Sequence, residues 1–317
     1  MTVCMPADMS ARMRARMRAA SVPEFHYRLP GLATGASPGA HRSQQGEGGF
    51  ELRASLPISR ARDIRRLDLQ ASLRDPFGEW AVRQFSQRLA LTVVLVADVS
   101  ASMAFAGGQS STASTASTAA SALTGPPARQ QVLADLADSL AASAWRNGDR
   151  FGLVGCDSQV CPDLLLPPSR SRGAGLALVA RLRGRALSGA SAAGLLQAWR
   201  HLPRQRALVF LVSDFQAPLA HTTALLASLA HHAVVPVVLW QAQEAGPAAR
   251  HGLLALQDPE TGQQRHLWWR PALRTQLASQ YMQRRAALQQ CFAAQRLRPL
   301  FVSGEFDADA MTRYFQA

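Results

Sequence analysis

Runs of apolar residues of strand length recur along the chain from Leu89 onward, and segments with helical spacing separate them. Most of the runs are continuous and rich in β-branched residues, which is typical of strands buried on both faces of a parallel sheet. The separating segments repeat apolar side chains every three or four positions, as a helix with one buried face requires. We predict strands at LALTVVLVA (89–97), RFGLVGC (150–156), RALVFLVSD (206–214), AVVPVVLW (233–240) and RPLFVSG (298–304), and helices within 128–150 and at 173–183, 191–201, 217–231, 270–296 and 307–315.

This alternation predicts an α/β fold in which helices cover both faces of an open, mostly parallel sheet. The domain is expected to span residues 89–317, with a low-complexity Ser/Thr/Ala tract at 107–127 as a loop or disordered insertion. Residues 1–23 are predicted to be a disordered basic N-terminus. Residues 24–88 are predicted to be an irregular N-terminal extension, in which 31–49 has the composition of a loop.

Charge and hydropathy limit the classes of protein to which the chain can belong. Its 34 basic residues are all arginine and outnumber 21 acidic residues, but they are spread along the chain, and aromatic residues make up only 7%. Nucleic-acid binding favours clustered basic charge with interleaved aromatic residues, so we expect no nucleic-acid partner. An acidic protein partner is compatible with the net charge of +13. Since no apolar run approaches the roughly 18 residues of a membrane span and no secretory signal is recognisable, we expect a cytoplasmic protein without a membrane span.

The spacing of cysteine and histidine gives no sign of a zinc site. Cys156 and Cys161 lie five positions apart, and the chain contains neither CxxC nor HExxH. We interpret the cysteines as free thiols and the histidines as structural or solvated. We also expect Asp68, Asp149 and Asp157 to make structural contacts.

The stretch LVADVSASM (95–103) carries the candidate chemistry. A predicted strand ends at Asp98, and Ser100 and Ser102 follow at alternate positions. In an extended segment such side chains point the same way, and in an open α/β sheet ligands bind beyond the carboxyl ends of the strands. Asp214, at the end of a second predicted strand, can supply another carboxylate. Oxygen donors of this kind suit Mg²⁺ or Mn²⁺. The alternative is a purely structural role, in which the Asp and Ser side chains cap turns and the first turns of helices.

DVSASM (98–103) resembles the metal-ion-dependent adhesion site of von Willebrand factor A (vWA) domains, which combines D-x-S-x-S with a distal Thr and a distal Asp. The order of predicted elements over 89–305 is similar to that Rossmann-like fold. The resemblance implies the metal ligands Asp98, Ser100, Ser102 and Asp214. No Thr stands at the distal position in ALSGASAAGLLQAW (186–199), where Ser191 is the first substitute and Ser188 the second, while a one-residue shift would place Ala190 there.

The preceding segment GEGGFELRASLPISRARDIRRLDLQASLRDPFGEWAVRQF (46–85) is similar to the corresponding part of the bacterial "domain of unknown function 58" family. NGDRFGLVGCDS (147–158), LVSDF (211–215) and DPETGQQ (258–264) also stand where that family places such motifs. The chain departs from the family at Leu69, where Trp is expected, and at SLPISRARD (55–63), which replaces a turn with two acidic residues.

Proteins that resemble this family commonly work beside MoxR-type AAA+ ATPases. The resemblance therefore implies a non-enzymatic interaction module whose divalent cation binds an acidic residue of the ATPase or of its client, as an adaptor or co-chaperone in the maturation of a client complex. One alternative is an Asp98-dependent phosphotransferase-like enzyme, although a P-loop enzyme is excluded because the chain has no GxxxxGK[ST] motif and no Lys. The other alternative is a scaffold with a vestigial metal site.

Overall fold

A computed structural model of the chain describes most of the predicted α/β domain and parts of the segment before it. The predicted insertion at 107–127 lies outside the described residues, as does the predicted disordered N-terminus apart from its last two residues. The described residues are 22–28, 38–42, 51–60, 64–86, 88–105, 128–241, 252–257 and 263–316.

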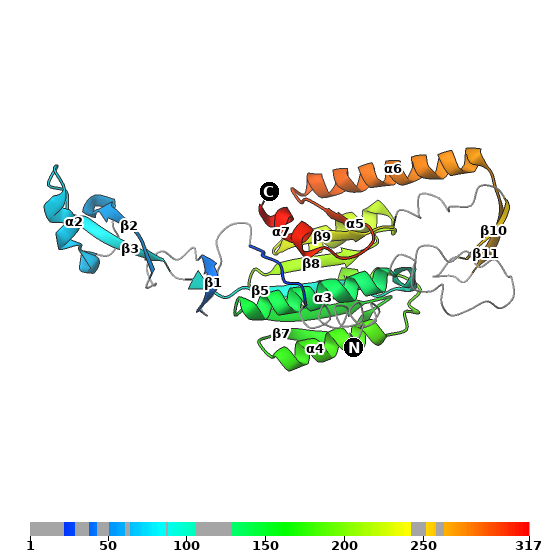
Figure 1. The fold of residues 1–317 in the computed structure, drawn as a ribbon, viewed down its shortest axis with the longest axis horizontal. Helices are drawn as coiled ribbons and strands as arrows, with labels where there is room; N and C mark the ends of the chain where they lie inside the picture. Colours follow the sequence, from blue (N-terminus) through cyan, green and yellow to red (C-terminus); the bar gives the residue numbers. More distant parts are fainter. Residues whose placement is uncertain are drawn as a thin grey trace, which may run out of the picture.

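A six-stranded sheet forms the centre of the domain (Figure 1). Its order is β12-β9-β8-β5-β6-β7, and every pairing is parallel except that of β6 with the edge strand β7. β7 was not predicted, because its sequence VCPDLLLPPS has neither the continuous apolar pattern of a buried strand nor the alternating pattern of a half-buried one. The strands are β5 (Thr92–Asp98), β6 (Arg150–Cys156), β7 (Val160–Ser169), β8 (Leu208–Ser213), β9 (Ala233–Leu239) and β12 (Leu300–Val302).

Helices cover both faces of this sheet (Figure 1). One apolar cluster joins the sheet to α3 (Arg129–Arg146), α4 (Arg172–Gly184) and α7 (Ala308–Gln316). The other joins it to η5 (Ala193–His201), α5 (Leu219–Ser228) and α6 (Pro271–Ala294). The predicted fold class is therefore confirmed, although the helix predicted at 191–201 is a 3₁₀-helix that begins at Ala193.

The apolar run in β5 is continuous because both of its faces are buried. Val93, Leu95 and Ala97 belong to the cluster under α3, whereas Val94 and Val96 belong to the cluster under η5 and α5. All five side chains are fully buried. Alternation along the strand thus divides one hydrophobic segment between two cores. Packing on both faces fixes the position of the C-terminal end of β5, at the edge of the sheet where its parallel strands end.

In the part of the chain that the structure describes, three small two-stranded sheets accompany the main one, and in each the strands are antiparallel. The prediction of a loop over 31–49 is wrong for residues 38–42, which form β1. This strand pairs with β4, and local composition does not indicate a partner so far away in the sequence. Figure 1 shows β2, β3 and α2 (Leu69–Arg74) at one end of the molecule, away from the main sheet. The pairs are β1 (Pro38–Arg42) with β4 (Arg88–Leu89), β2 (Glu51–Pro57) with β3 (Ala81–Ser86), and β10 (Gly252–Gln257) with β11 (Gln264–Trp269).

Residues 22–28 pack against the α/β domain although they precede it by about 60 positions in the sequence. Phe25 and Tyr27 are buried in the cluster under α3. The Tyr27 hydroxyl donates to Asp149 Oδ2 at 2.5 Å, and burial followed by the charge of Asp149 raises the pKa of Tyr27 well above its usual value. Asp149 Oδ1 also accepts from the backbone N–H of Leu91 at 2.7 Å, so this carboxylate has the structural role predicted for it.

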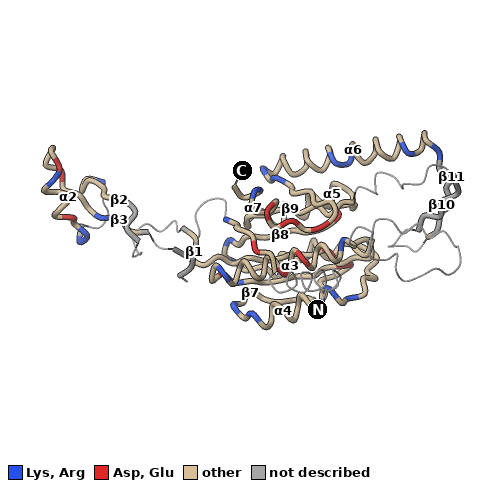
Figure 2. The backbone as a smooth tube through the Cα atoms, in the orientation of Figure 1, with Lys and Arg blue, Asp and Glu red and all other residues tan. Residues whose placement is uncertain are grey.

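Basic residues lie on several elements, among them α2, α4 and α6, rather than on a single one (Figure 2). Asp68 likewise has a structural role, because it caps the first turn of α2 and pairs with Arg83. Among the described residues, no helix combines the length and the apolarity needed to cross a membrane.

Replacement of Phe25 by Ala should lower the free energy of unfolding by about 3–5 kcal/mol, because a buried aromatic ring is lost from the core. The ring lies 6.0 Å from Tyr27 and Phe210 and 6.2 Å from Phe306, centroid to centroid. Urea denaturation followed by circular dichroism measures the change. The control is Phe77→Ala, since Phe77 is 89% exposed and should change stability by no more than about 0.5 kcal/mol. Equal effects of the two substitutions would show that residues 22–28 are not part of the core.

Candidate metal site at the sheet edge

Two aspartates lie at the ends of neighbouring parallel strands. Asp98 is the last residue of β5, and Asp214 directly follows β8. The two strands pair with Ala97 opposite Val212, so both carboxylates reach the same edge of the sheet. The strand order reverses between β5 and β8, and ligands bind at such switch points in open α/β sheets.

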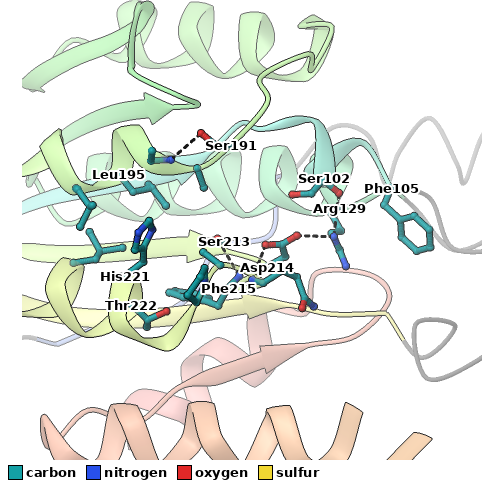
Figure 3. A pocket seen from close by; sticks show the side chains of 17 residues that line it. Ser102, Phe105, Arg129, Ser191, Leu195, Ser213, Asp214, Phe215, His221 and Thr222 are labelled. Carbon is teal, nitrogen blue, oxygen red and sulfur yellow. Dashed lines mark hydrogen bonds and ion pairs between the residues drawn. The ribbon is translucent and has the colours of Figure 1, made fainter. Parts of the chain in front are cut away.

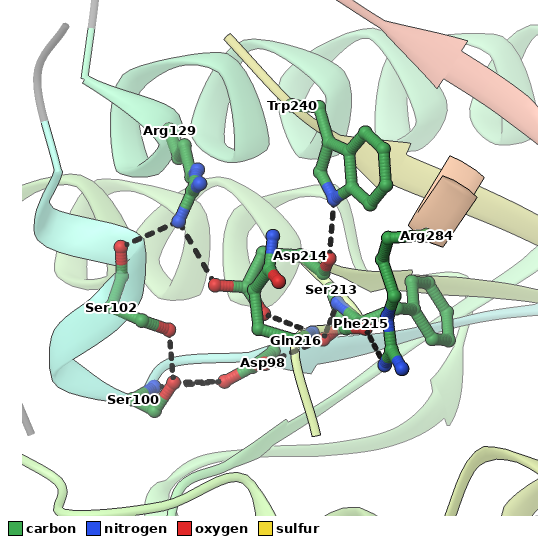
Figure 4. A network of polar contacts seen from close by, with 10 residues as sticks. All are labelled: Asp98, Ser100, Ser102, Arg129, Ser213, Asp214, Phe215, Gln216, Trp240 and Arg284. Atoms are coloured by element: carbon green, nitrogen blue, oxygen red, sulfur yellow. Dashed lines mark hydrogen bonds and ion pairs between the residues drawn. The ribbon is translucent and has the colours of Figure 1, made fainter. Parts of the chain in front are cut away.

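Asp98 is fully buried, and hydrogen bonds engage both of its carboxylate oxygens (Figure 4). Oδ1 accepts from the backbone N–H and the hydroxyl of Ser100, at 2.9 and 2.7 Å. Oδ2 accepts from the hydroxyl of Ser213 at 2.6 Å. Burial and, second, the negative charge of Asp214 raise the pKa of Asp98 to about 6, although the hydrogen bonds oppose this shift. A nearby cation would offset the electrostatic repulsion between the two carboxylates and so favour their ionised forms.

The hydroxyls of Ser100 and Ser102 complete a compact group of oxygens, and their Oγ atoms are 3.1 Å apart. The two hydroxyls lie close together for a different reason from the predicted alternation along an extended segment. The chain is extended only as far as Ser100, and the 3₁₀-helix η3 (Ala101–Ala104) then turns Ser102 toward Ser100. In an octahedral Mg²⁺ complex with ligands at about 2.0–2.1 Å, neighbouring ligand oxygens lie about 2.9 Å apart. The 2.7 Å separation of Asp98 Oδ1 from Ser100 Oγ and the 3.1 Å separation of the hydroxyls are hydrogen-bond distances, and they are compatible with this value. The donor set therefore fits a hard divalent cation.

Asp214 is held by a buried arginine that the sequence analysis did not identify. Arg129 Nη1 donates to Asp214 Oδ2 at 2.9 Å, and both side chains are only 5% exposed. The same nitrogen donates to the backbone carbonyl of Ser102 at 3.0 Å, and the guanidinium carbon lies 5.3 Å from the centroid of the Phe105 ring. Arg129 thus bridges the two strand-end segments, and its positive charge opposes the binding of a metal ion.

The position of Arg129 at the start of α3 could have drawn attention to it. A cation is unfavourable at a helix N-terminus, because the helix dipole is positive there. No acidic residue stands in the first turn of α3 to offset it, and the compensating carboxylate is Asp214, which is 85 positions away in the sequence. Only the tertiary structure reveals this partner.

The loop after β8 presents Asp214 in a constrained conformation. Phe215 has a φ of 50°, in the left-handed region that a bulky residue rarely adopts. Its ring packs edge-on against Phe292 of α6 at a centroid distance of 5.3 Å, and its carbonyl accepts from Arg284 Nη2 at 2.8 Å. The indole N–H of Trp240 donates to the Asp214 carbonyl at 2.6 Å. These contacts from α6 and the end of β9 hold the loop in place.

Of the three candidates for the distal hydroxyl position, only Ser191 lines the pocket at this edge. Its hydroxyl accepts a long 3.5 Å hydrogen bond from the N–H of Ala193, and Figure 3 shows it on the η5 side of the pocket, apart from Ser102. Ser188 and Ala190 are exposed. The loop is docked at Gly189, whose carbonyl accepts from the N–H of Ala101 at 2.9 Å.

A pocket of about 540 Å³ opens beside the oxygen cluster (Figure 3). Its size is typical of ligand-binding pockets. Arg129, Asp214 and Ser102 contribute polar groups, while most of the remaining wall is apolar. The apolar wall includes Phe105, Leu195, Leu196, Phe215, Pro218 and Leu225. The site could therefore accept a charged group together with an adjacent apolar side chain.

Cys156, Cys161 and Asp157 do not line the pocket at this site. Burial raises the pKa of the Cys156 thiol far above its usual value and that of Cys161 to about 11, so neither favours the thiolate that binds zinc. Asp157 accepts the N–H of Gln159 at 3.0 Å and packs against Gly189, which agrees with a structural role.

Comparison with known proteins identifies relatives. Residues 60–287 match the profile of the family described as "Protein of unknown function DUF58". An "Uncharacterized protein in moxR 3'region" of Paracoccus denitrificans is 37% identical over 99 residues, which cover 31% of this chain and 94% of that protein.

Two solved structures are also similar, each at 12% sequence identity. BatB from Bacteroides thetaiotaomicron has a TM-score of 0.37, and the match covers 72% of this chain and 96% of that one. An aerotolerance-related membrane protein from Bacteroides fragilis NCTC 9343 has a TM-score of 0.38, with coverages of 72% and 97%.

Replacement of Gly189 by Ala should destabilise the loop that carries Ser191. An added Cβ would lie 2.4 Å from the Cβ of Asp157, so the loop or its neighbour would have to move. Overpacking of this kind typically costs about 1–3 kcal/mol of unfolding free energy, measurable by urea denaturation. Gly173→Ala in α4 is the control, because its Cβ would meet no atom within 4 Å. If Gly189→Ala is as stable as this control, the loop is not fixed as the structure shows.

Proposed function

The chain belongs to the family described as protein of unknown function DUF58, and on this premise we propose that it is a non-enzymatic protein-interaction module that binds an acidic side chain of a partner. The observation that carries the proposal is the group of oxygens from Asp98, Ser100, Ser102 and Asp214 beside an open, largely apolar pocket. A protein side chain with a carboxylate could reach the polar end of this pocket, and the apolar wall could bury the residues next to it.

Mg²⁺ or Mn²⁺ is the proposed cofactor. Asp98, Ser100, Ser102 and Asp214 would hold the ion, with Ser191 as the candidate distal ligand. When bound, the ion would supply positive charge and a coordination position for the partner's carboxylate. The separations of the Asp98, Ser100 and Ser102 oxygens support this assignment, as does the accumulation of two carboxylates at one sheet edge.

The burial of Asp98 favours binding over phosphotransfer. A nucleophilic carboxylate must present one oxygen to the substrate. Asp98 is fully buried, and the hydroxyls of Ser100 and Ser213 occupy its two oxygens. Its side chain is thus arranged to orient the neighbouring hydroxyls rather than to attack a phosphoryl group, and in the proposed metal site it would act through these hydroxyls and its negative charge.

The proposed partner is a MoxR-type AAA+ ATPase or its client. The relative in Paracoccus denitrificans, named for its place in the moxR 3' region, supports this choice. In this role the protein would be a cytoplasmic adaptor or co-chaperone that exchanges an acidic segment with such an ATPase. The pocket would bind this segment, and the net charge of +13 would attract it.

Titration calorimetry with Mg²⁺ and Mn²⁺ tests the metal site. The wild-type protein should bind one ion, whereas Asp98→Asn should abolish binding, because it removes the central negative charge. Ser191→Ala should weaken binding if Ser191 is the distal ligand, and unchanged affinity would remove it from the ligand set. Asp309→Asn, which alters an exposed aspartate on α7, is the control and should bind as the wild type does. Equal binding by Asp98→Asn would refute the site.

Affinity purification from the native host, with and without a chelator, tests the partner. We expect an AAA+ ATPase to be recovered with the wild-type protein in the presence of Mg²⁺ and to be lost with chelator or with Asp98→Asn. Recovery that is independent of both would contradict metal-dependent docking. A phosphatase assay run in parallel should show no turnover that depends on Asp98, and any such turnover would favour the enzymatic alternative.

A further inference from the structure

Arg129 already provides a positive charge where the metal site would need one. Its Nη1 atom lies 2.9 Å from Asp214 Oδ2 and 3.0 Å from the carbonyl oxygen of Ser102, so it contacts two of the four residues proposed to hold the ion (Figure 4). Both partners of the ion pair are nearly inaccessible to solvent, at 5% exposure each. The contact is therefore built into the site and is not a pairing between long side chains on the surface.

Electrostatics makes this arrangement incompatible with full metal occupancy. Two like charges that lie close together in a buried site repel much more strongly than they do in water, because the effective dielectric constant is lower. A carboxylate oxygen that accepts from a guanidinium is also less available as a ligand. Asp214 would face this competition directly, since its second oxygen already accepts from the N–H of Gln216 at 3.1 Å.

We propose that Arg129 is the resident cation of this site, and that a divalent ion binds only when the guanidinium leaves Asp214. Arg129 is thus a positioning residue that sets the metal affinity. This inference rests on the proposed metal-binding function and adds its regulation.

Phe105, which the guanidinium already contacts, could keep this contact when the side chain leaves Asp214. Arg129 and Phe105 both line the pocket, and Phe105 is exposed while its ring lies 5.3 Å from the guanidinium carbon. Stacking on an aromatic face stabilises a cation. The backbone N–H of Arg129 also donates to the Phe105 carbonyl at 3.2 Å, so the start of α3 and the end of η3 would hold the side chain near the site in both positions.

Calorimetric titration of Arg129→Met with Mg²⁺ tests the inference. Met keeps the length and apolar stem of the side chain but removes its charge, so the dissociation constant should fall at least about tenfold relative to the wild type, which corresponds to about 1.4 kcal/mol. The control is Arg183→Met, because Arg183 also forms ion pairs with α3, through Asp135 and Asp138, but contacts no residue of the site. It should bind Mg²⁺ with wild-type affinity.

The outcomes separate this inference from the function on which it rests. Binding by Arg129→Met that is tenfold tighter than the wild type, or binding by the variant alone, supports competition. Equal affinity of the two proteins overturns the role of Arg129 and leaves the metal site intact. No binding by either protein overturns both proposals.

A measurement on the wild-type protein covers the case in which Arg129→Met fails to fold. The side-chain ¹⁵N–¹H resonance of Arg129, assigned by its loss in Arg129→Lys, should shift on titration with Mg²⁺ as the ion pair with Asp214 breaks. An unchanged Arg129 resonance at saturating Mg²⁺ would refute displacement.

Discussion

The parallel pairing of β5 with β8 is the constraint on which the site depends. It places the carboxylates of Asp98 and Asp214 side by side where the strand order reverses, and burial prevents water from screening their repulsion. Positive charge is the simplest physical remedy. The structure supplies Arg129 for this purpose, and a divalent ion at the proposed metal site would compete with it for the same position.

This competition gives the site a physical basis for regulation. A metal site without an internal cation binds the ion without first having to displace a positive charge. A site that contains a buried guanidinium binds the ion less tightly, and its occupancy can then depend on the partner's carboxylate, which adds negative charge at the same place. Metal and partner would thereby bind cooperatively, since each would favour the displaced position of Arg129.

The rest of the domain holds this edge rigid. Two apolar clusters fix β5 from both faces, Trp240 and Arg284 hold the loop after β8, and Gly189 docks the loop that carries Ser191. At the opposite end of β5, residues 22–28 contribute Phe25 and Tyr27 to the core. Residues 22–28 are therefore part of what stabilises the sheet, although they lie far from it in the sequence.

The sequence by itself determined the strands of the main sheet other than β7 and most of the helices that cover it, because a buried element of regular structure needs a hydrophobic pattern with its own period. It also determined which residues end the strands, and hence Asp98 and Asp214 as a candidate pair. Only the tertiary structure decided that η3 turns Ser102 toward Ser100, that β4 gives β1 a partner, and that Arg129 pairs with Asp214. These contacts join residues through the fold rather than through periodic spacing along the chain, and a local pattern carries no information about a partner 85 positions away.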